Sequence, residues 1–189
     1  MNVDYRDVNR DSRNDCERLA RWNNDPAIKH LFNRFGDAES FERPFTAEDF
    51  QRTGGTPDLQ VPFKTLMVLV NDEPVGMAHF AIGGPRLLEP TPRTAWISVM
   101  IGEKPLQGRG LGRQVVTHLE ELAAEAGATC VEIGVFAYNA VSIRFFERLG
   151  YEEFARIPGH AWWAGQLWDD IRMRKPLQNS SPSRGDQHG

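Results

Sequence analysis

The chain has 189 residues, of which 40% are hydrophobic and 25% are charged, and its formal net charge is −4. This composition is typical of a globular protein with one buried core, so a single domain is expected over residues 1–177, followed by a flexible polar tail over residues 178–189. The acidic balance provides no overall basic field for nucleic acid, and no stretch approaches the ~20 apolar residues of a membrane span. We therefore expect a cytoplasmic protein without a nucleic-acid or membrane partner.

The first fifty residues show patterns of short helices. Apolar residues between positions 16 and 22 recur at helical spacing. Asp25 followed by Pro26 is typical of a cap and a first helical residue, and Thr46 with Asp49 resembles a capping box. Three short helices are expected in this part of the chain.

From residue 63 the pattern changes to strands. The strands expected after a chain break at residues 54–57 are residues 65–70, 75–82, 94–101, 129–136, 151–156 and 167–173. Turn residues separate the first two, which predicts a hairpin. Amphipathic helices are expected to end at Gly127 and Gly150, because apolar residues recur at helical spacing before each glycine. The order of elements favours an α/β or α+β fold with a mixed sheet.

Glycines at positions 108, 110 and 112 lie between an expected strand and an expected helix. Backbone N–H groups of such a turn attract anions, and Arg109 and Arg113 add positive charge, although glycine-rich turns also occur without a ligand. The dinucleotide pattern G-x-G-x-x-G fails because Arg113 stands at its third glycine, and no Gly-Lys-Ser/Thr of a nucleoside-triphosphate loop occurs. A phosphate ester of another kind is left as the candidate ligand.

Residues 107–112, Gln-Gly-Arg-Gly-Leu-Gly, resemble the R/Q-x-x-G-x-G/A signature of the GNAT superfamily of N-acetyltransferases. Residues 139–151 resemble a second signature of that family, an Asn-capped helix that ends in Gly-aromatic. The resemblance covers residues 65–177 and implies a mixed, mostly antiparallel GNAT-like sheet with helices on both faces. The N-terminal helices and the segment at residues 165–170 resemble most closely the branch that acetylates ribosomal-protein N-termini and small polyamines.

The resemblance implies acetyl-CoA as co-substrate and no metal. The residues implied in binding it are Met100, Ile101, Gln107, Gly108, Arg109, Gly110, Leu111, Gly112, Arg113 and Asn139. By the same resemblance, the strand at residues 96–101 splays from its neighbour and its backbone holds the pantetheine. An N–H near Met100 or Ile101 then polarises the thioester carbonyl as an oxyanion hole. Asn139 is expected to contact the pantetheine arm, to cap its helix, or to do both.

Attack on a thioester requires an uncharged amine, yet an amine with a pKa of ~10.4 is neutral only to about one part in a thousand at pH 7. A base or a desolvating pocket is therefore needed. Glu103, just beyond the strand, and His79, on the neighbouring strand, are candidate catalytic bases that could act through a water chain. Glu132 is a third candidate. The alternatives are a solvated loop carboxylate for Glu103 and a packed, hydrogen-bonded ring for His79.

The chain departs from the family at Phe146, where many members carry a tyrosine placed to protonate the departing thiolate. A thiol with a pKa of ~8.5 leaves more easily than an alkoxide, so this departure slows the chemistry without abolishing it. Tyr138 and Tyr151 are candidate replacements because they lie nearby in sequence.

The aromatic run at residues 160–170 places tryptophans beside carboxylates. Trp168 and Asp170 are candidate substrate-binding residues for a cationic amine, and a hairpin or dimer contact is the alternative. The function indicated is transfer of the acetyl group from acetyl-CoA to a primary amine by direct attack of that amine on the thioester. The amine belongs to a peptide N-terminus, a polyamine or an amine-bearing small molecule. The protein is expected to be a monomer or a homodimer. The competing hypothesis is a catalytically weak acyl-CoA-binding sensor or regulatory module.

Overall fold

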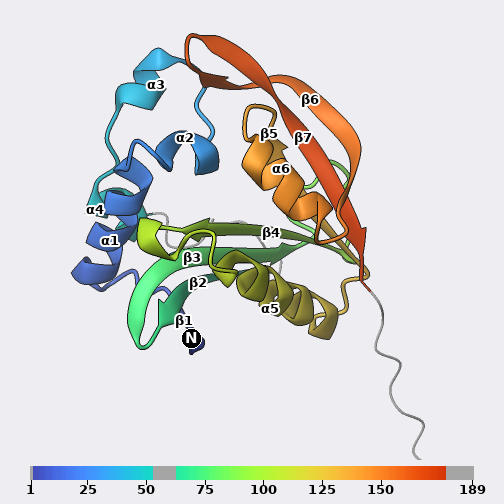
Figure 1. The fold of residues 1–189 in the computed structure, drawn as a ribbon, viewed down its shortest axis with the longest axis horizontal. Helices are drawn as coiled ribbons and strands as arrows, with labels where there is room; N and C mark the ends of the chain where they lie inside the picture. Colours follow the sequence, from blue (N-terminus) through green and yellow to red (C-terminus); the bar gives the residue numbers. More distant parts are fainter. Residues whose placement is uncertain (1, 53–62, 178–189) are drawn as a thin grey trace, which may run out of the picture.

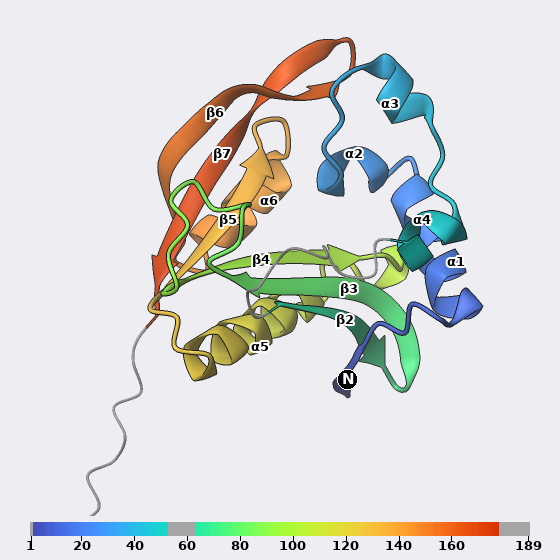
Figure 2. The same ribbon diagram turned by 180° about the vertical axis from the view of Figure 1, so that it is seen from behind.

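The computed structural model describes residues 2–52 and 63–177. A seven-stranded sheet in the order β1-β2-β3-β4-β5-β7-β6 runs through the molecule (Figures 1 and 2). Its strands are β1 (Val3–Asp7), β2 (Phe63–Val70), β3 (Glu73–Ile82), β4 (Thr94–Ile101), β5 (Cys130–Phe136), β6 (Glu152–Trp163) and β7 (Gln166–Pro176). Neighbouring strands are antiparallel except for the parallel pair β4–β5. The predicted mixed, mostly antiparallel sheet is confirmed.

Helices cover both faces of the sheet. They are α1 (Arg13–Asn24), α2 (Lys29–Phe32), α3 (Ala38–Glu42), α4 (Ala47–Arg52), the 3₁₀ turn η1 (Lys104–Leu106), α5 (Leu111–Glu125) and α6 (Ala140–Glu147). Residues of α5 and α6 belong to the larger core cluster, which includes Leu66 and Val68 of β2. Residues of α1 and α2 instead pack with Met67 and Met100. Since side chains alternate along a strand, the two helical groups lie on opposite faces.

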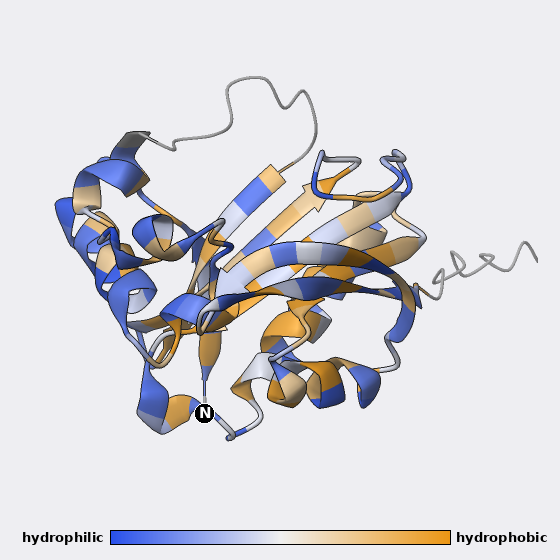
Figure 3. Cartoon of the chain, turned by 90° about the horizontal axis from the view of Figure 1, so that it is seen from above, coloured by the Kyte–Doolittle hydropathy of each residue, from blue (hydrophilic) through white to orange (hydrophobic). Residues whose placement is uncertain are grey.

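The hydropathy of the chain follows this arrangement. Figure 3 shows hydrophobic colour concentrated along the strands and on parts of the helices, while much of the outer helical surface is hydrophilic. Among the described residues, none of the helices combines the length and the apolar character needed to cross a membrane.

The N-terminal part differs from its prediction in three respects. Strand β1 and helix α3 were not predicted, although the side chain of Asp37 caps α3 in a capping box with Ser40. Helix α2 begins at Lys29 rather than at Pro26, because the side chain of Asp25 accepts a hydrogen bond from Ala27 N at 2.8 Å and holds a turn there. The expected helices at residues 16–22 and after position 46 are present as α1 and α4.

The C-terminal hairpin is longer than predicted. The expected strands at residues 151–156 and 167–173 belong to β6 and β7, which pair along most of their lengths. Strand β6 was underestimated because Pro158 and Gly159 interrupt its pattern, and an irregularity between Ile157 and Ala161 accommodates them. The predicted break at residues 54–57 and the predicted tail at residues 178–189 lie outside the described residues.

Candidate active site

The parallel strands β4 and β5 stay paired over only a short stretch. Their partners are Thr94 with Cys130, Ala95 with Val131 and Trp96 with Glu132. Beyond Trp96 the two strands diverge, and Figure 1 shows β5 and the β6–β7 hairpin rising away from β1–β4. We call this divergence, between residues 97–101 and 133–136, the β4–β5 fork. The splayed strand implied by the resemblance is therefore present, and among the described residues its backbone groups have no strand partner on that side.

The hydrogen-bond register shows which backbone groups of β4 face the fork. Gly102 N donates to Val75 O at 2.9 Å, so Gly102 is bonded to the β3 side. Because bonded and non-bonded residues alternate in an antiparallel pair, Met100 is also bonded to β3, whereas Val99 and Ile101 direct their backbone groups toward the fork. The register thus favours Ile101 over Met100 for the expected oxyanion-hole N–H, and it adds Val99.

The glycine loop follows β4 and leads into α5. Gly108 and Gly110 have φ of +74° and +81°, a left-handed conformation that favours glycine. Gly110 precedes α5 without a side-chain cap, which leaves the first N–H groups of the helix available to an anion. The side-chain amide of Gln107 donates to Ile101 O at 2.9 Å and joins the loop to the end of β4. This geometry fits the anion site predicted for residues 107–112.

Gly112 lies in the first turn of α5 and faces α6. A Cβ at this position would lie 3.4 Å from the Phe145 ring, an ordinary contact distance. Leu111 is buried in the core beside it. Arg109 and Arg113 are exposed next to the loop, where their charges can reach a bound phosphate.

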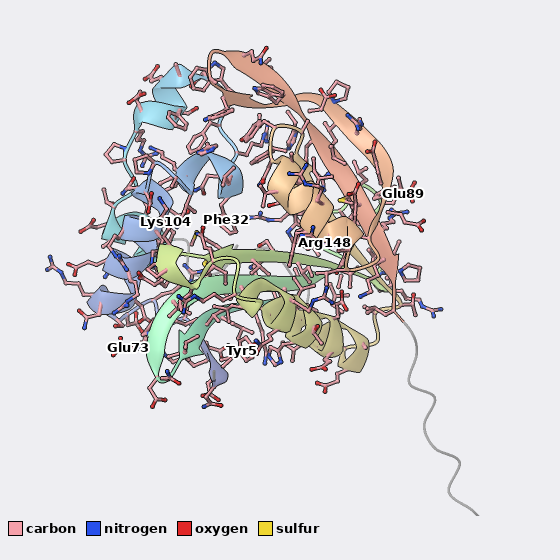
Figure 4. The ribbon with its side chains drawn as sticks, viewed as in Figure 1. Tyr5, Phe32, Glu73, Glu89, Lys104 and Arg148 are labelled. Carbon is pink, nitrogen blue, oxygen red and sulfur yellow. The ribbon has the colours of Figure 1, made fainter. Side chains whose placement is uncertain are left out.

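A cavity of about 620 Å³ occupies the fork. Strands β4 and β5 and helix α6 form one side, and the other side comes from the α2 region, the β3–β4 loop and the β6–β7 hairpin. Figure 4 labels Phe32, a lining residue of α2, where that helix faces β4. The lining side chains that carry charge or hydrogen-bonding groups include Arg34, Arg86, Ser98, Asn139, Ser142, His160, Asp170 and Arg172. The glycine loop does not line this cavity.

Asp170 of β7 pairs with Phe136 at the end of β5, and its side chain reaches the fork. Its side chain is buried against Gly134, where a Cβ would be 2.8 Å from Oδ1 and 2.9 Å from Oδ2. Arg172 Nε lies 3.0 Å from Oδ2, whereas Oδ1 has no hydrogen-bond partner among the described residues. Burial raises the pKa of Asp170, and the Arg172 charge only partly opposes this. The cavity is therefore lined by a buried carboxylate whose Oδ1 is unpaired among the described residues but has less than 1 Å² of accessible surface.

Glu132 is fully buried and serves the structure around Asp170. Its two oxygens lie 3.4 Å from Arg172 and 3.4 Å from Arg174, so its charge is compensated. It also accepts a hydrogen bond from Leu88 N at 3.0 Å, while Arg172 donates to Arg86 O at 2.6 Å. This buried pair fixes the β3–β4 loop over the cavity. Glu132 is thus committed to these contacts and does not line the cavity.

Comparison with known families decides the identity of this fold. Residues 22–151 match the model described as the Acetyltransferase (GNAT) family. The chain belongs to the GNAT acetyltransferase family. The recognition made from the two sequence signatures is confirmed. The matched residues include both strands of the fork and the glycine loop.

Individual GNAT relatives are more distant. The chain is 29% identical over 77 residues to "Putative phosphinothricin acetyltransferase YwnH" of Bacillus subtilis, over 41% of this chain and 47% of that protein. It is 36% identical over 69 residues to the N-terminal acetyltransferase B complex catalytic subunit naa20 of Schizosaccharomyces pombe, over 36% of this chain and 38% of that protein. The chain thus spans less than half the length of these curated relatives.

A solved structure extends the likeness to nearly the whole chain. The structure of yncA from Salmonella typhimurium, with acetyl-CoA as its cofactor, has a TM-score of 0.68 and 22% identity. The match covers 97% of this chain and 99% of that one, which shows that the two share their fold.

Asn139 has the capping role expected of the second GNAT signature. Its side chain accepts a hydrogen bond from Ser142 N at 3.1 Å and begins α6. Asn139 also lines the cavity, so a contact with the pantetheine arm stays a prediction.

Glu103, the first predicted base, is engaged elsewhere. It accepts a hydrogen bond from Trp22 Nε1 at 3.0 Å and pairs with Arg21. Partial burial alone would raise the pKa of Glu103, but the hydrogen bonds from Trp22 and Arg21 outweigh it and the pKa lies below the ordinary value. Glu103 ties α1 to the end of β4 and is not among the residues that line the cavity. Its role as a base stays a prediction.

His79, the second predicted base, lies beside the cavity on β3. It pairs with Ser98, a lining residue, and its Nδ1 is 3.4 Å from Thr65 Oγ1. Burial, together with the charges of Arg86 and Arg10, lowers the pKa of His79 to about 4. The ring is therefore neutral at pH 7 but a weak base. Its catalytic role also stays a prediction.

Phe146 lines the cavity and packs against Tyr151, so this wall offers no phenolic proton. The Tyr151 hydroxyl instead donates to Glu120 at 2.8 Å, and the Tyr138 hydroxyl donates to a backbone carbonyl of α2. Burial raises the pKa of both tyrosines. Neither lines the cavity. Ser98 and Ser142 do line the cavity with their hydroxyl groups, and neither was predicted from the sequence as a site residue.

Trp168, predicted to bind substrate, belongs to an aromatic contact between the β6–β7 hairpin and α2. Its Nε1 donates to Trp163 O at 3.0 Å, and its ring meets Tyr138 edge-on at 5.5 Å. Trp163 in turn stacks on His30 at 4.7 Å. This packing matches the hairpin alternative, and Trp168 is not among the cavity-lining residues, so substrate contact by this residue stays a prediction.

Sequence reasoning missed several polar residues that the fold brings to the cavity. They are Arg34, Arg86, Ser98, Ser142, His160 and Arg172. His160 was visible only as part of an aromatic run, and the arginines come from three separate segments. Among the described residues, no group of three metal-ligating side chains could hold an ion.

Proposed function

We propose that this GNAT chain transfers the acetyl group of acetyl-CoA to a primary amine. The observation that carries the proposal is the β4–β5 fork. It joins a cavity with a buried carboxylate to the free backbone edge of β4, and that edge leads into an anion site at the start of α5. The acceptor cavity thus lies along residues 96–99 of β4, and the donor anion site follows the end of the same strand.

The residues around the fork fit acetyl-CoA. The N–H groups of the glycine loop and of the first turn of α5 would hold the pyrophosphate, with Arg109 and Arg113 adding charge. The backbone of Val99 and Ile101 would hold the pantetheine. When bound, acetyl-CoA supplies an acetyl thioester whose carbonyl carbon is attacked by the amine as the CoA thiol departs. The N–H of Val99 or Ile101 would stabilise the negative charge that develops on the carbonyl oxygen.

Asp170 is the group best placed to receive the acceptor. Its side chain lines the cavity, and its raised pKa makes it a stronger base than an ordinary carboxylate. Because Oδ1 is occluded, a small movement of the side chain must expose it before an ammonium group can bind. We therefore assign it the removal of the ammonium proton. His160, which also lines the cavity, can pass that proton on because burial and the charges of Arg34 and Arg172 lower its pKa and keep it neutral.

The acceptor named at the sequence level was a peptide N-terminus, a polyamine or a small amine. A cytoplasmic location and a monomeric or homodimeric state belong to the same proposal. Phe146 supports the competing hypothesis of a weak enzyme or sensor, because it provides no acid for the departing thiol.

Thiol release from acetyl-CoA, measured with and without a panel of primary amines, tests the proposal. We expect release that depends on the amine, together with an acetylated product identified by mass spectrometry. Tight acetyl-CoA binding without amine-dependent release across the panel would support the sensor instead. Absence of acetyl-CoA binding would overturn both.

A further inference from the structure

Lys29, the first residue of α2, carries a buried ammonium group without a carboxylate partner. Its exposed fraction is 8%, and within residues 2–52 and 63–177 it forms no ion pair. Its Nζ donates to the neutral carbonyl of Arg43 at 3.0 Å. Because the removal of an ammonium group from water is costly unless other groups replace its hydration, the surroundings of Lys29 must compensate for its charge.

Three phenylalanine rings surround this ammonium group. Lys29 Nζ lies 5.6, 5.1 and 5.8 Å from the ring centroids of Phe35, Phe41 and Phe45. An ammonium group at such a distance is attracted to the negative face of an aromatic ring, most strongly where water is excluded. We call Lys29 and these three rings the Lys29 cage. It joins the segment after α2, helix α3 and the segment before α4 around one cation.

The Lys29 cage is attached to the β6–β7 hairpin. Phe35 O accepts a hydrogen bond from Trp162 N at 2.8 Å, and the Phe41 ring lies 5.7 Å from the Trp162 ring. His30 of α2 stacks on Trp163 at 4.7 Å. Figures 1 and 2 both show the tip of the hairpin beside α3. The cage therefore fixes the short N-terminal helices to the hairpin.

This attachment reaches the cavity at the fork. Residues 31–34 line the cavity, and Arg34 Nε donates to the carbonyl of His160, another lining residue, at 2.9 Å. Lys29 and Phe35 stand on either side of residues 31–34, so the cage holds this stretch from both ends. Helix α2 has only four residues, and a helix this short is not stable by its own hydrogen bonds. The position of this wall of the cavity therefore depends on the cage.

An apolar side chain could fill the space of Lys29. Replacement of a buried charge by a hydrophobic residue of similar volume is often neutral or stabilising, so the ammonium group is not needed for overall stability. It supplies direction instead, because it must reach both the Arg43 carbonyl and the ring faces. A flexible methionine could pack in several ways and would select no single arrangement of these segments.

We infer that Lys29 is a positioning residue for the acceptor side of the reaction. Its caged ammonium group fixes residues 31–34 as a wall of the cavity and so determines how tightly an amine binds there. Lys29 does not line the cavity, and it takes no part in the chemistry. The cage does not contact the glycine loop, so the donor site is independent of it. The inference rests on the proposed acetyl transfer and adds a residue to it.

Substitutions of Lys29 separate its charge from its volume. Glycinamide, L-alanine and spermidine are compared in the thiol-release assay, and the amine that the wild type acetylates fastest is used with each variant. We expect Lys29→Met to raise the KM for that amine about tenfold and to leave the KM for acetyl-CoA unchanged. The free energy of unfolding in urea should stay equal or rise. Lys29→Arg keeps a cation over the rings and should restore part of the affinity for the amine.

Two further variants test the route of the effect. Lys64→Met removes an exposed lysine of β2 and is the control, which should leave both KM values unchanged. Phe41→Leu removes the nearest ring of the cage and should raise the amine KM more in the wild type than in Lys29→Met, because the ring acts through the cation. Circular dichroism confirms that each variant is folded.

Hydrogen exchange provides a readout that needs no activity. In Lys29→Met the backbone amides of residues 29–45 should exchange about tenfold faster than in the wild type, whereas those of α5 should exchange at the same rate. Unchanged exchange at residues 29–45 would show that the ammonium group does not hold this segment, and it would overturn the inference.

The kinetic outcomes separate this inference from the proposed function. Equal amine KM values in the wild type and in folded Lys29→Met overturn the inference while retaining the acetyltransferase. A similar rise in both KM values, with a loss of stability that Lys29→Arg does not restore, assigns Lys29 to the fold alone and also overturns it. Failure of the wild type to acetylate any amine, with acetyl-CoA bound, overturns the proposed function itself.

Discussion

His160 Nε2 lies 3.9 Å from Asp170 Oδ2, and both side chains line the cavity at the fork. The pKa of His160 is lowered by burial and by the charges of Arg34 and Arg172, whereas the pKa of Asp170 is raised, chiefly by burial. The two shifts bring the proton affinities of a carboxylate and an imidazole closer together than in water. A proton taken up by Asp170 therefore has a neutral neighbour to which it can pass.

We predict that Asp170→Asn lowers kcat by about 10²- to 10⁴-fold, the usual contribution of a positioned base. Asp169→Asn is the matched control, because the Asp169 carboxylate accepts a hydrogen bond from Gly159 N at 3.1 Å outside the cavity. In the wild type, kcat/KM should rise with pH through the raised pKa of Asp170, since the deprotonated carboxylate is the active form. A larger loss of kcat in Glu103→Gln than in Asp170→Asn would show that Glu103 is the base.

Gly134 leaves the space that the Asp170 carboxylate occupies. We predict that Gly134→Ala displaces this carboxylate, because the new Cβ would lie 2.8 Å from Oδ1 and 3.0 Å from the Trp96 ring. Activity should fall by about 10²-fold, with a loss of roughly 1–3 kcal/mol in the free energy of unfolding. Gly36→Ala, where a Cβ meets nothing within 4 Å, controls for the added methyl group. Urea denaturation and steady-state kinetics measure both effects, and unchanged kinetics in folded Gly134→Ala would contradict the placement of Asp170.

A substitution in the glycine loop is expected to weaken the binding of acetyl-CoA selectively. Gly110→Ala and Gly127→Ala both force a left-handed residue at an end of α5, with φ of +81° and +87°, and a Cβ meets nothing within 4 Å at either position. Each should cost about 1–2 kcal/mol of stability. Only Gly110→Ala should raise the KM for acetyl-CoA, by about tenfold, because it disturbs the N–H groups that face the pyrophosphate. Equal KM values in the two variants would place the pyrophosphate elsewhere.

The lowered pKa of the buried His79 is expected to make the stability of the protein depend on pH. Its pKa is about 4 in the folded protein and near 6.5 when unfolded, so between these values the unfolded chain binds the extra proton. Stability from this group is therefore complete above pH 6.5 and falls as the pH drops toward 4, by about 3 kcal/mol. His79→Gln should flatten the curve of unfolding free energy against pH in this window. Parallel curves for the two proteins would show that His79 is not desolvated.

The parts of the site that could be predicted from the sequence are formed by residues that lie close together in the chain. Left-handed glycines at 108 and 110 and the Asn139 cap are local backbone requirements, so their spacing alone indicates a loop and a helix start. Asp170, which lines the cavity, was selected from the sequence because it stands in an unusual aromatic run. By contrast, β1 was missed because it has only five residues and half-buried positions at Val3 and Tyr5.

The remaining site residues depend on tertiary packing. Arg86 enters the cavity because the buried Glu132 and Arg172 hold its loop, and neither contact leaves a pattern in the sequence. Glu103 was selected for its position after β4, but the sequence could not show that α1 would bring Trp22 and Arg21 to it. Charge at an active site is set by such pairings, which only the folded chain defines.

Calorimetric titration with acetyl-CoA, combined with thiol release in the same samples, tests the central claim most directly. The wild type and Asp170→Asn should bind acetyl-CoA equally well, whereas Gly110→Ala should bind it about tenfold more weakly. Of the three proteins, Asp170→Asn is the one expected to bind acetyl-CoA tightly without releasing the CoA thiol when an amine is added. Failure of the wild type to bind, or full activity in Asp170→Asn, would contradict a donor on the glycine loop and an acceptor at the fork.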